Sequence, residues 1–357
     1  MSTASSSWST LIEELLESIF NCLEDSRDVF RCGLVCVSWR AVALKSYSKL
    51  IPCVLSSQRD EKTHTLFNIQ TMETQKIQIP DYFPDIHCST NYGWLIQFTE
   101  AGVDFNSDDD LPHKIHMLNL FSKAKVILPP TRNQIDKAAT STCPLNPECL
   151  VLVAYLCKYD YKLAFCKVGD ENWTTLDRSY FVTEPQDCFL SVTWYKGKFY
   201  GVDADKRLFV CNLSSKMIEL FCEEPFVIGF RFCETYLVES LFGELLLVFY
   251  YQRRQDIFKM YEFDFIAKKW YEVKNLRNQA LFLSRDGSAL SYIGNSKMVK
   301  RSCIIHFASR SYSFQCKYRH DLVVYDMETE SFEFIPESTT IGFTEFYTHL
   351  IAPDLCH

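Results

Sequence analysis

The stretch "KMYEFDFIAKKWYEV" (residues 259–273) contains a pattern that recurs through most of this chain. Apolar and polar residues largely alternate in its first half, a polar turn begins at Asp264, and a second strand ends with apolar residues. A period of two indicates a β-strand with one buried face, and two such strands joined by a short polar turn indicate a hairpin.

Hairpins of the same design recur along the chain. The other copies lie at 66–80, 115–130, 163–177, 207–221 and 322–336. The equivalent turn starts are Gln70, Asn119, Lys167, Asn212, Asp264 and Asp326. A further apolar strand follows each hairpin, at 91–98, 149–156, 198–203, 244–251, 303–309 and 346–352. Propeller blades repeat every ~40–50 residues, so this spacing predicts an all-β propeller with six blades.

The order of these segments predicts how the propeller closes. The first hairpin has no strand of suitable pattern before it, and the strand at 346–352 has no hairpin after it. We expect this C-terminal strand to complete the first blade, because closure removes the unpaired edges that a sheet must otherwise protect.

Composition and charge exclude several classes of partner. The formal net charge is −8, and no stripe of Lys and Arg is present, so we expect neither nucleic acid nor an anionic membrane as a partner. The N-terminus lacks the positive region of a signal peptide, and the apolar run at 241–251 is too short to span a membrane. We therefore expect a reduced, intracellular chain, in the cytoplasm, the nucleus or both, whose 16 cysteines are mostly small buried hydrophobes.

Motifs for metals, cofactors and catalysis are absent from the sequence. No Cys or His spacing typical of zinc, no glycine-rich phosphate loop and no nucleophile elbow occurs. The acidic segment 104–113 resembles a calcium loop but has Asp109 where glycine is needed and Ile115 where a ligand is needed. We predict no metal, no cofactor and no catalytic residue, and we interpret 132–148 as a long loop that is either a substrate contact or poorly ordered.

The first fifty residues have a helical period instead. Apolar residues fall on one stripe of a helix, and Thr10 with Glu13 suggests a capping box. The stripe consists of Ile12, Leu15, Leu16, Ile19, Phe20 and Leu23. A second short helix is predicted after Ser26, through Val29, Phe30, Leu34 and Val35, and a third is capped by Ser38 and carries Trp39, Val42 and Ala43. So small a unit buries little surface alone, so we expect it to be covered by a partner.

Residues 8–43, "WSTLIEELLESIFNCLEDSRDVFRCGLVCVSWRAVA", resemble an F-box. The matching positions are Leu11, Glu14, Leu15, Leu16, Ile19, Leu23, Val35, Cys36, Trp39 and Arg40. Ile12 departs from the family pattern, which usually has proline there. The resemblance implies that these residues bind a Skp-type adaptor, which joins the chain to a cullin-based ubiquitin ligase.

The same residues have structural interpretations. Cys36 is a nucleophile only if a base lies nearby, and otherwise it is a structural cysteine. Trp39 is a core residue, a partner contact or both, and Arg40 either pairs with an adaptor carboxylate or faces solvent. Leu15, Leu16 and Ile19 could equally be ordinary core residues.

The remainder resembles the KIB type of plant F-box protein, which has a kelch-like propeller. The matching segments are "GWLI" (93–96), "YKGKFYGVD" (195–203), "YLVES" (236–240), "GELLLV" (243–248), "LFLSRDGSALS" (281–291) and "DLVVYDMETESFEFIP" (321–336). The "LFLS" portion lacks the family's usual glycine. We expect a flexible N-terminus at 1–7, a three-helix F-box at 8–50 and the propeller at 51–357.

Together these features predict a non-enzymatic substrate receptor of an SCF-type ubiquitin ligase, whose propeller holds a target protein. Two other classes remain open. One is a propeller enzyme of the hydrolase or lyase type, which would have carboxylates with shifted pKa values at the channel mouth. The other is a scaffold that works without a ligase.

Overall fold

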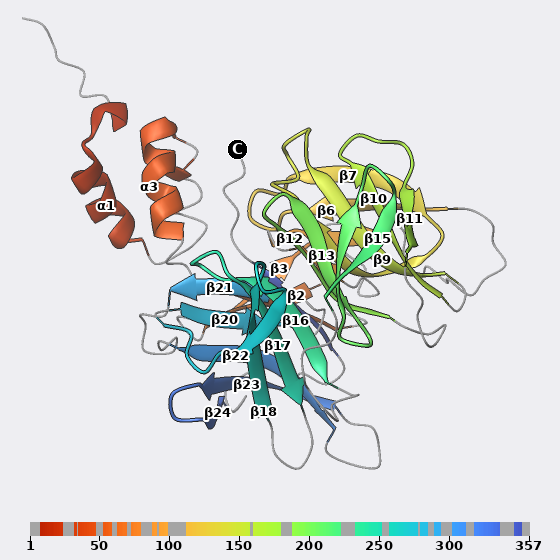
Figure 1. Cartoon of the computed structure of the whole chain (residues 1–357). Coiled ribbons are helices and arrows are strands. Elements are labelled where there is room, and N and C mark those ends of the chain that lie inside the picture. Colours follow the sequence, from red (N-terminus) through yellow and green to blue (C-terminus); the bar gives the residue numbers. More distant parts are fainter. Residues whose placement is uncertain are drawn as a thin grey trace, which may run out of the picture.

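A computed structural model describes most of the chain. The described residues are 8–23, 32–33, 35–47, 53–58, 63–69, 73–79, 88–90, 93–98, 112–157, 160–179, 188–222, 233–251, 257–277, 279–284, 289–293, 302–311, 318–335 and 346–351. The predicted flexible N-terminus, most of the second helix and most of the acidic segment at 104–113 lie outside these residues. Figure 1 shows short helices at one end of the chain and strands in the rest.

In the described residues the helical part contains a 3₁₀ turn and two α-helices with defined bounds, and residues 32–33 are also helical. The elements with defined bounds are η1 (Trp8–Thr10), α1 (Glu13–Asn21) and α3 (Val37–Tyr47). The capping box predicted at Thr10 is wrong, because Ile12 is the N-cap of α1, in an extended conformation and without a side-chain cap hydrogen bond. The amides of Leu15 and Leu16 instead donate to the carbonyl oxygen of Ile12, both at 3.2 Å. Ser38 likewise lies inside the first turn of α3 instead of capping it.

The strands form five hydrogen-bonded sheets in the described chain. The first contains β25 (Phe346–Ile351), β1 (Cys53–Gln58), β2 (Thr63–Asn68) and β3 (Glu73–Gln78), in that order. The second contains β4 (Cys88–Ser89), β5 (Leu95–Phe98), β6 (His113–Leu118) and β7 (Lys125–Thr131). Both are antiparallel throughout.

An eight-stranded sheet consists of two antiparallel units. The first unit contains β8 (Gln134–Thr140), β9 (Leu150–Cys157), β10 (Asp160–Lys167) and β11 (Thr174–Arg178). The second contains β12 (Phe189–Tyr195), β13 (Lys198–Asp203), β14 (Leu208–Asn212) and β15 (Met217–Cys222). A short parallel pairing of β11 with β15 joins the two units at their outer strands.

Two more sheets complete the described strands. One contains β16 (Glu234–Glu239), β17 (Leu245–Tyr251), β18 (Ile257–Asp264) and β19 (Lys269–Glu272). The other contains β21 (Ala289–Ile293), β20 (Gln279–Leu283), β22 (Cys303–Ser311), β23 (Tyr318–Asp326) and β24 (Ser331–Ile335). Here β20 lies between β21 and β22, is parallel to β22, and is buried along its whole length.

All predicted hairpins are present as the two outer strands of a unit. Several of their turns begin with a side chain that accepts hydrogen bonds from backbone amides of the turn. Asp264 Oδ1 accepts from the amides of Ile266 at 2.7 Å and Ala267 at 2.9 Å. Asp326 and Asn119 accept in the same way in their own turns. The repeated Asp or Asn at the turn start therefore has a direct structural cause, because it satisfies amides that the tight turn leaves unpaired.

The predicted closure by the C-terminal strand is confirmed. β25 pairs antiparallel with β1 along its whole length, from Cys53 opposite Ile351 to Gln58 opposite Phe346. The premise that no strand precedes the first hairpin was wrong, because β1 does so and takes the place that 346–352 was expected to fill. β25 is instead the innermost strand of this sheet, in contact with β4.

Apart from β25, which lies within the predicted strand at 346–352, the innermost strands were missed by the sequence pattern. β25, β4, β8, β12, β16 and β21 each lie at one edge of a unit and contact the next in turn. The interpretation of 132–148 as a loop is wrong over 134–140, where β8 pairs with β9. The strand was not recognised from the sequence because the polar residues Gln134, Asp136 and Lys137 interrupt the alternation of apolar and polar residues that identifies a strand.

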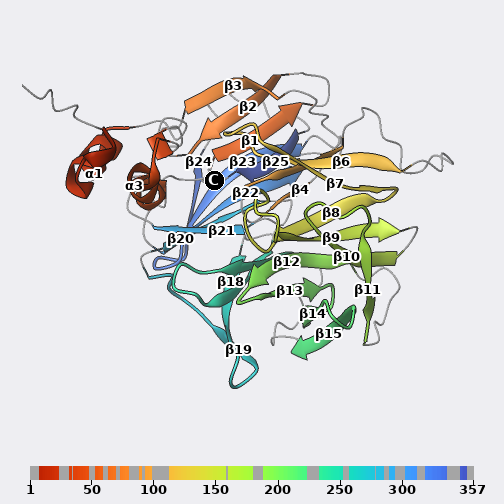
Figure 2. The ribbon, with the colours of Figure 1, turned by 90° about the horizontal axis from the view of Figure 1, so that it is seen from above.

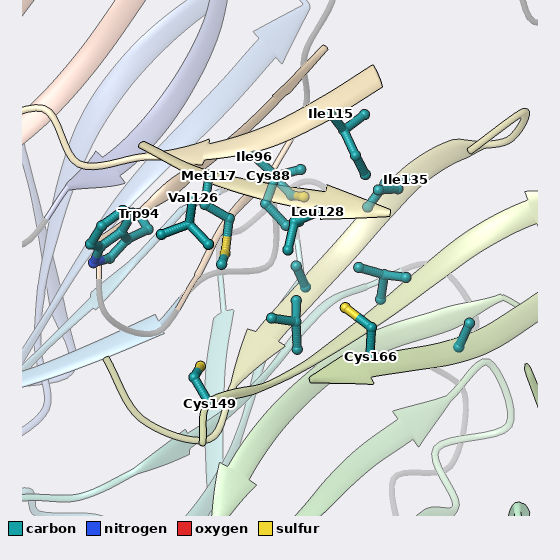
Figure 3. Close-up of a cluster of buried hydrophobic side chains, with 14 residues drawn as sticks. Cys88, Trp94, Ile96, Ile115, Met117, Val126, Leu128, Ile135, Cys149 and Cys166 are labelled. Atoms are coloured by element: carbon teal, nitrogen blue, oxygen red, sulfur yellow. The ribbon is translucent and has the colours of Figure 1, made fainter. Parts of the chain in front are cut away.

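Buried side chains fill the spaces between neighbouring units. Figure 3 shows one such cluster, in which Met117 and Leu128 from the second sheet meet Ile135 and Cys166 from the next unit. A comparable cluster packs Val54 of β1 against Ile305 of β22, so the last sheet adjoins the first. The described strands thus form a propeller-like ring, shown from a second side in Figure 2.

Cysteines are mostly small residues of these clusters. Six of those described with free thiols are buried, namely Cys53, Cys88, Cys149, Cys166, Cys211 and Cys303. Burial raises the pKa of the Cys149 thiol, as expected for an inert residue. Cys143 differs from these, because it is disulfide-bonded.

Candidate functional site

The helical part has a small core of its own. Leu16, Phe20, Trp39, Val42 and Ala43 are buried together, with Leu16 only 1% exposed and Trp39 8%. The Trp39 indole Nε1 donates to the carbonyl oxygen of Trp8 at 2.9 Å, and its ring meets Phe20 edge to face at 5.8 Å between centroids. These contacts fix α3 against α1, because a buried tryptophan needs a partner for its N–H group.

A second group of apolar residues in the helical part faces outward. It consists of Trp8, Ile12, Leu15, Val35 and Val37, and we name it the exposed apolar set. The exposed fractions run from 52% for Leu15 to 81% for Val37. Five large exposed apolar side chains on so small a unit indicate that it interacts with a partner, because exposed apolar surface commonly marks binding sites.

The sheets leave this set open. In Figures 1 and 2 both helices stand beside the strands, with α3 nearer to them and α1 on its far side. These side chains are exposed in the chain as a whole, so the ring does not cover them.

The ten residues predicted to contact an adaptor lie in one small unit but differ in exposure. Leu16 and Trp39 are buried, and Glu14, Leu15 and Val35 are exposed. The others are half-buried: Leu11, Ile19, Leu23, Cys36 and Arg40. Sequence reasoning overlooked Trp8 and Val37, although both are large apolar residues directly beside a predicted helix.

Cys36 lies immediately before α3, where it caps the helix. Its Sγ is 3.1 Å from the Ser38 Oγ, and its carbonyl oxygen accepts from the Arg40 amide at 2.9 Å. The hydrogen bond with the Ser38 side chain, followed by one from the Trp39 backbone, lowers the pKa of the thiol. Hydroxyl and backbone N–H groups cannot remove a proton, so this geometry fits a capping role and supplies no base for a nucleophile.

Elsewhere the described residues offer little chemistry. No group of three or more His, Cys, Asp or Glu side chains within them is placed to hold a metal ion. Burial raises the pKa of the Glu239 carboxyl. None of the helices in this part is long and apolar enough to cross a membrane.

Comparisons with known proteins agree with this division of the chain. Residues 66–326 match the model of the KIB1-4 beta-propeller family, and residues 8–48 match the F-box-like model. A putative F-box protein of Arabidopsis thaliana, At5g55150, is 29% identical over 86% of this chain and 86% of its own length. The F-box protein SKIP23 of the same plant is 25% identical over 79% of each chain.

Among solved structures, TolB from Acinetobacter baumannii superposes with a TM-score of 0.46 at 6% identity, over 87% of this chain and 70% of TolB. That likeness carries no inference about function. The family match covers most of the chain and coincides with the ring of sheets, whereas the F-box-like match coincides with the helices. The chain therefore belongs to the KIB1-4 beta-propeller family and carries an F-box-like segment ahead of its propeller.

Proposed function

We propose that this protein is the substrate-recognition subunit of an SCF-type cullin–RING ubiquitin ligase. Its F-box binds a Skp-type adaptor and, through it, the cullin, and its propeller holds a target protein in the cytoplasm or nucleus. The chain supplies position and effective concentration, whereas the ubiquitin-transfer chemistry occurs on other subunits. The observation that carries this proposal is the exposed apolar set on the F-box-like unit.

The energetics of that set suit a protein partner. Covering a large apolar side chain completely is worth about 1.5–3 kcal/mol, and these five are already partly covered, so each contributes less. Several together still suffice to anchor a helical unit in an apolar groove. Of the predicted contacts, we assign direct ones to Leu11, Glu14, Leu15, Ile19, Val35 and Arg40, and we assign Leu16, Leu23, Cys36 and Trp39 to supporting them.

We further infer six blades, with a domain boundary near residue 50. The two units of the eight-stranded sheet count as separate blades, because each has its own innermost strand and its own antiparallel order. On this basis residues 8–50 form the F-box, 51–357 form the propeller, and 1–7 precede both. β20 is then an insertion in the last blade.

Adaptor pull-down tests the proposal. Leu15→Asp combined with Val37→Asp places two charges in the exposed apolar set and should abolish capture of the adaptor without lowering the melting temperature. The matched control is Ile127→Asp, because Ile127 of β7 is 80% exposed but lies in the propeller, and this variant should bind normally. Undiminished capture by the double variant would contradict the proposal and favour a scaffold that works without a ligase.

A further inference from the structure

The turn between β12 and β13 lies at the centre of a second surface, which belongs to the propeller. Lys196 and Gly197 form this turn, both with positive φ, of 43° and 84°. The direction of the strands places it at the same end of the ring as the β14–β15 and β18–β19 turns. We name the described side chains of these three turns the hairpin-end surface: Trp194, Lys196, Lys198, Ser214, Phe265 and Lys268.

A cavity of about 270 Å³ opens on one side of the turn. Trp194, Phe199, Leu150 and Leu213 supply apolar walls, and Lys198 supplies a cation. Sites for drug-sized ligands occupy ≈ 300–1,000 Å³, so this cavity suits a single large side chain better than a cofactor. Side chains held in such pockets supply much of the affinity of protein interfaces.

Glu219 also lines this cavity, but it has a partner. The Asn212 Nδ2 donates to the Glu219 Oε1 at 2.9 Å. The cation of Lys198 is exposed at the same cavity. The cavity therefore combines apolar walls with an available positive charge.

Cations and aromatic rings occupy the other side of the turn. The Lys196 Nζ lies 4.9 Å from the centre of the Tyr195 ring and 5.9 Å from that of Phe265. The Tyr195 hydroxyl donates to the carbonyl oxygen of Gly243 at 2.7 Å, which fixes the ring beneath the lysine. The Lys268 Nζ lies 5.5 Å from the centre of the Phe221 ring. Two exposed lysines, Lys196 and Lys268, therefore lie over aromatic rings.

An exposed isoleucine adjoins these lysines. Ile266 is 98% exposed in the β18–β19 turn, between Phe265 and Lys268. Two carboxylates act on Lys196, first Glu239 and then Glu244, and Glu244 also pairs with the Arg277 guanidinium at 3.0 Å. The three turns, residues 195–198, 212–217 and 264–269, contain five lysines and one acidic residue, Asp264, so they are locally positive on a chain whose formal net charge is −8.

We propose that the hairpin-end surface binds an acidic segment of a partner protein that carries one large apolar side chain. That side chain enters the cavity beside Trp194, and the neighbouring carboxylates meet Lys196 and Lys198. Complementary charge selects the segment and speeds its association, whereas the pocket supplies most of the affinity. Identifying this partner with the ligase target rests on the proposed function, but the binding itself does not.

Selection from a random dodecapeptide display library on the full chain tests this inference. We expect enriched peptides to have Asp or Glu within a few residues of Leu, Phe or Trp. Enrichment of basic peptides, or of no class, would overturn the inference. For an enriched peptide with a fluorescent label, anisotropy should show affinity that falls as salt rises, because the charges lie at the surface.

Three variants locate the binding site. Lys196→Glu with Lys198→Glu should lower the affinity for the labelled peptide at least tenfold. The control Lys76→Glu reverses an exposed charge on β3 and should leave that affinity within twofold of the parent's. Ser214→Trp fills the cavity without changing charge and should also weaken binding at least tenfold, which covers the case in which the double variant fails to fold. Equal affinity for the parent chain and a folded variant of either kind would contradict the proposed site.

The same variants separate this inference from the proposed function. The lysine double variant should retain adaptor capture, and Leu15→Asp with Val37→Asp should retain peptide binding. Loss of only one activity in each variant assigns the two activities to different surfaces. If the parent chain binds no acidic peptide but still captures the adaptor, the receptor function stands and the hairpin-end surface is excluded as a peptide-binding site.

Discussion

Large apolar residues are mostly buried in the ring, whereas several of them are exposed in the helical part. Each unit of the ring packs against a neighbour on either side, so residues such as Leu163, Leu247 and Ile305 are completely buried. Among its described residues the helical part has one small core, and Ile12 and Leu15 lie outside that core and remain exposed. Small units bury a smaller fraction of their surface, so what they leave exposed is available for binding.

Removing the closing strand should have the largest effect on this contrast. Deletion of residues 343–357 leaves β1 paired with β2 alone and exposes the buried Val54 and Leu55. We expect the cooperative thermal transition of the ring to disappear in circular dichroism, since an open ring loses the packing on both sides of a unit. Adding a synthetic peptide of residues 343–357 should restore the transition, and an unchanged melting temperature after deletion would refute closure.

Two adjacent leucines test the inside and outside of α1. Leu16→Ala should destabilise the helical part by about 2–5 kcal/mol, because it leaves a cavity in its only described core. Leu15→Ala, one residue earlier, should change stability by less than about 0.5 kcal/mol, since its side chain is already half exposed. Hydrogen exchange of the α1 amides measures both, and equal effects would mean that the two faces are not distinct.

Acid should destabilise the ring through a buried histidine. Burial of His64, which is 1% exposed, lowers its pKa from 6.5 to about 4. The unfolded chain therefore binds a proton at higher pH than the folded chain, so this contribution is complete above pH 6.5 and is lost as the pH falls through 4. At 1.36 kcal/mol per pKa unit, the loss is about 3 kcal/mol.

Denaturant unfolding between pH 7 and 4 isolates this contribution. His64→Leu should lose less stability on acidification than the parent chain does, whereas His113→Leu, at a less buried position of β6, should match the parent. Identical pH slopes for the parent and His64→Leu would show that the ring tolerates a proton on His64.

The smallest expected effect concerns a turn. Asp264→Ala removes the acceptor of two backbone amides and should cost about 1 kcal/mol in denaturant unfolding. Ile266→Ala in the same turn should cost almost nothing, because its side chain is exposed. If both substitutions lowered the free energy of unfolding equally, the Asp264 side chain would not be what stabilises the turn.

Sequence patterns predicted the outer strands because their physical cause is local. The hairpins alternate in polarity and begin their turns with Asp or Asn, as at Asp326, and both signals are visible in a few adjacent residues. Innermost strands depend on neighbours distant in sequence. β4 has only two residues, and the polar residues of β8 do not indicate that it is the innermost strand of its unit.

For the candidate site, the sequence predicted the helix but not its orientation. Periodicity placed Ile12, Leu15, Leu16 and Phe20 on one stripe, and the structure divides that stripe between a buried and an exposed side. The division depends on where α3 packs, and nothing local to α1 encodes that. The hairpin-end surface was unpredictable for the same reason, since its residues come from three separate hairpins.

The position of β25 late in the sequence also determines the order in which the two regions can fold during translation. The helices emerge from the ribosome before the strands, whereas β25, which pairs with β1, is translated after all the other described strands. A nascent chain can therefore present its helical part before its first sheet is complete. A chain stalled after residue 335 should remain sensitive to protease in β1, and a chain that has emerged beyond residue 351 should lose that sensitivity.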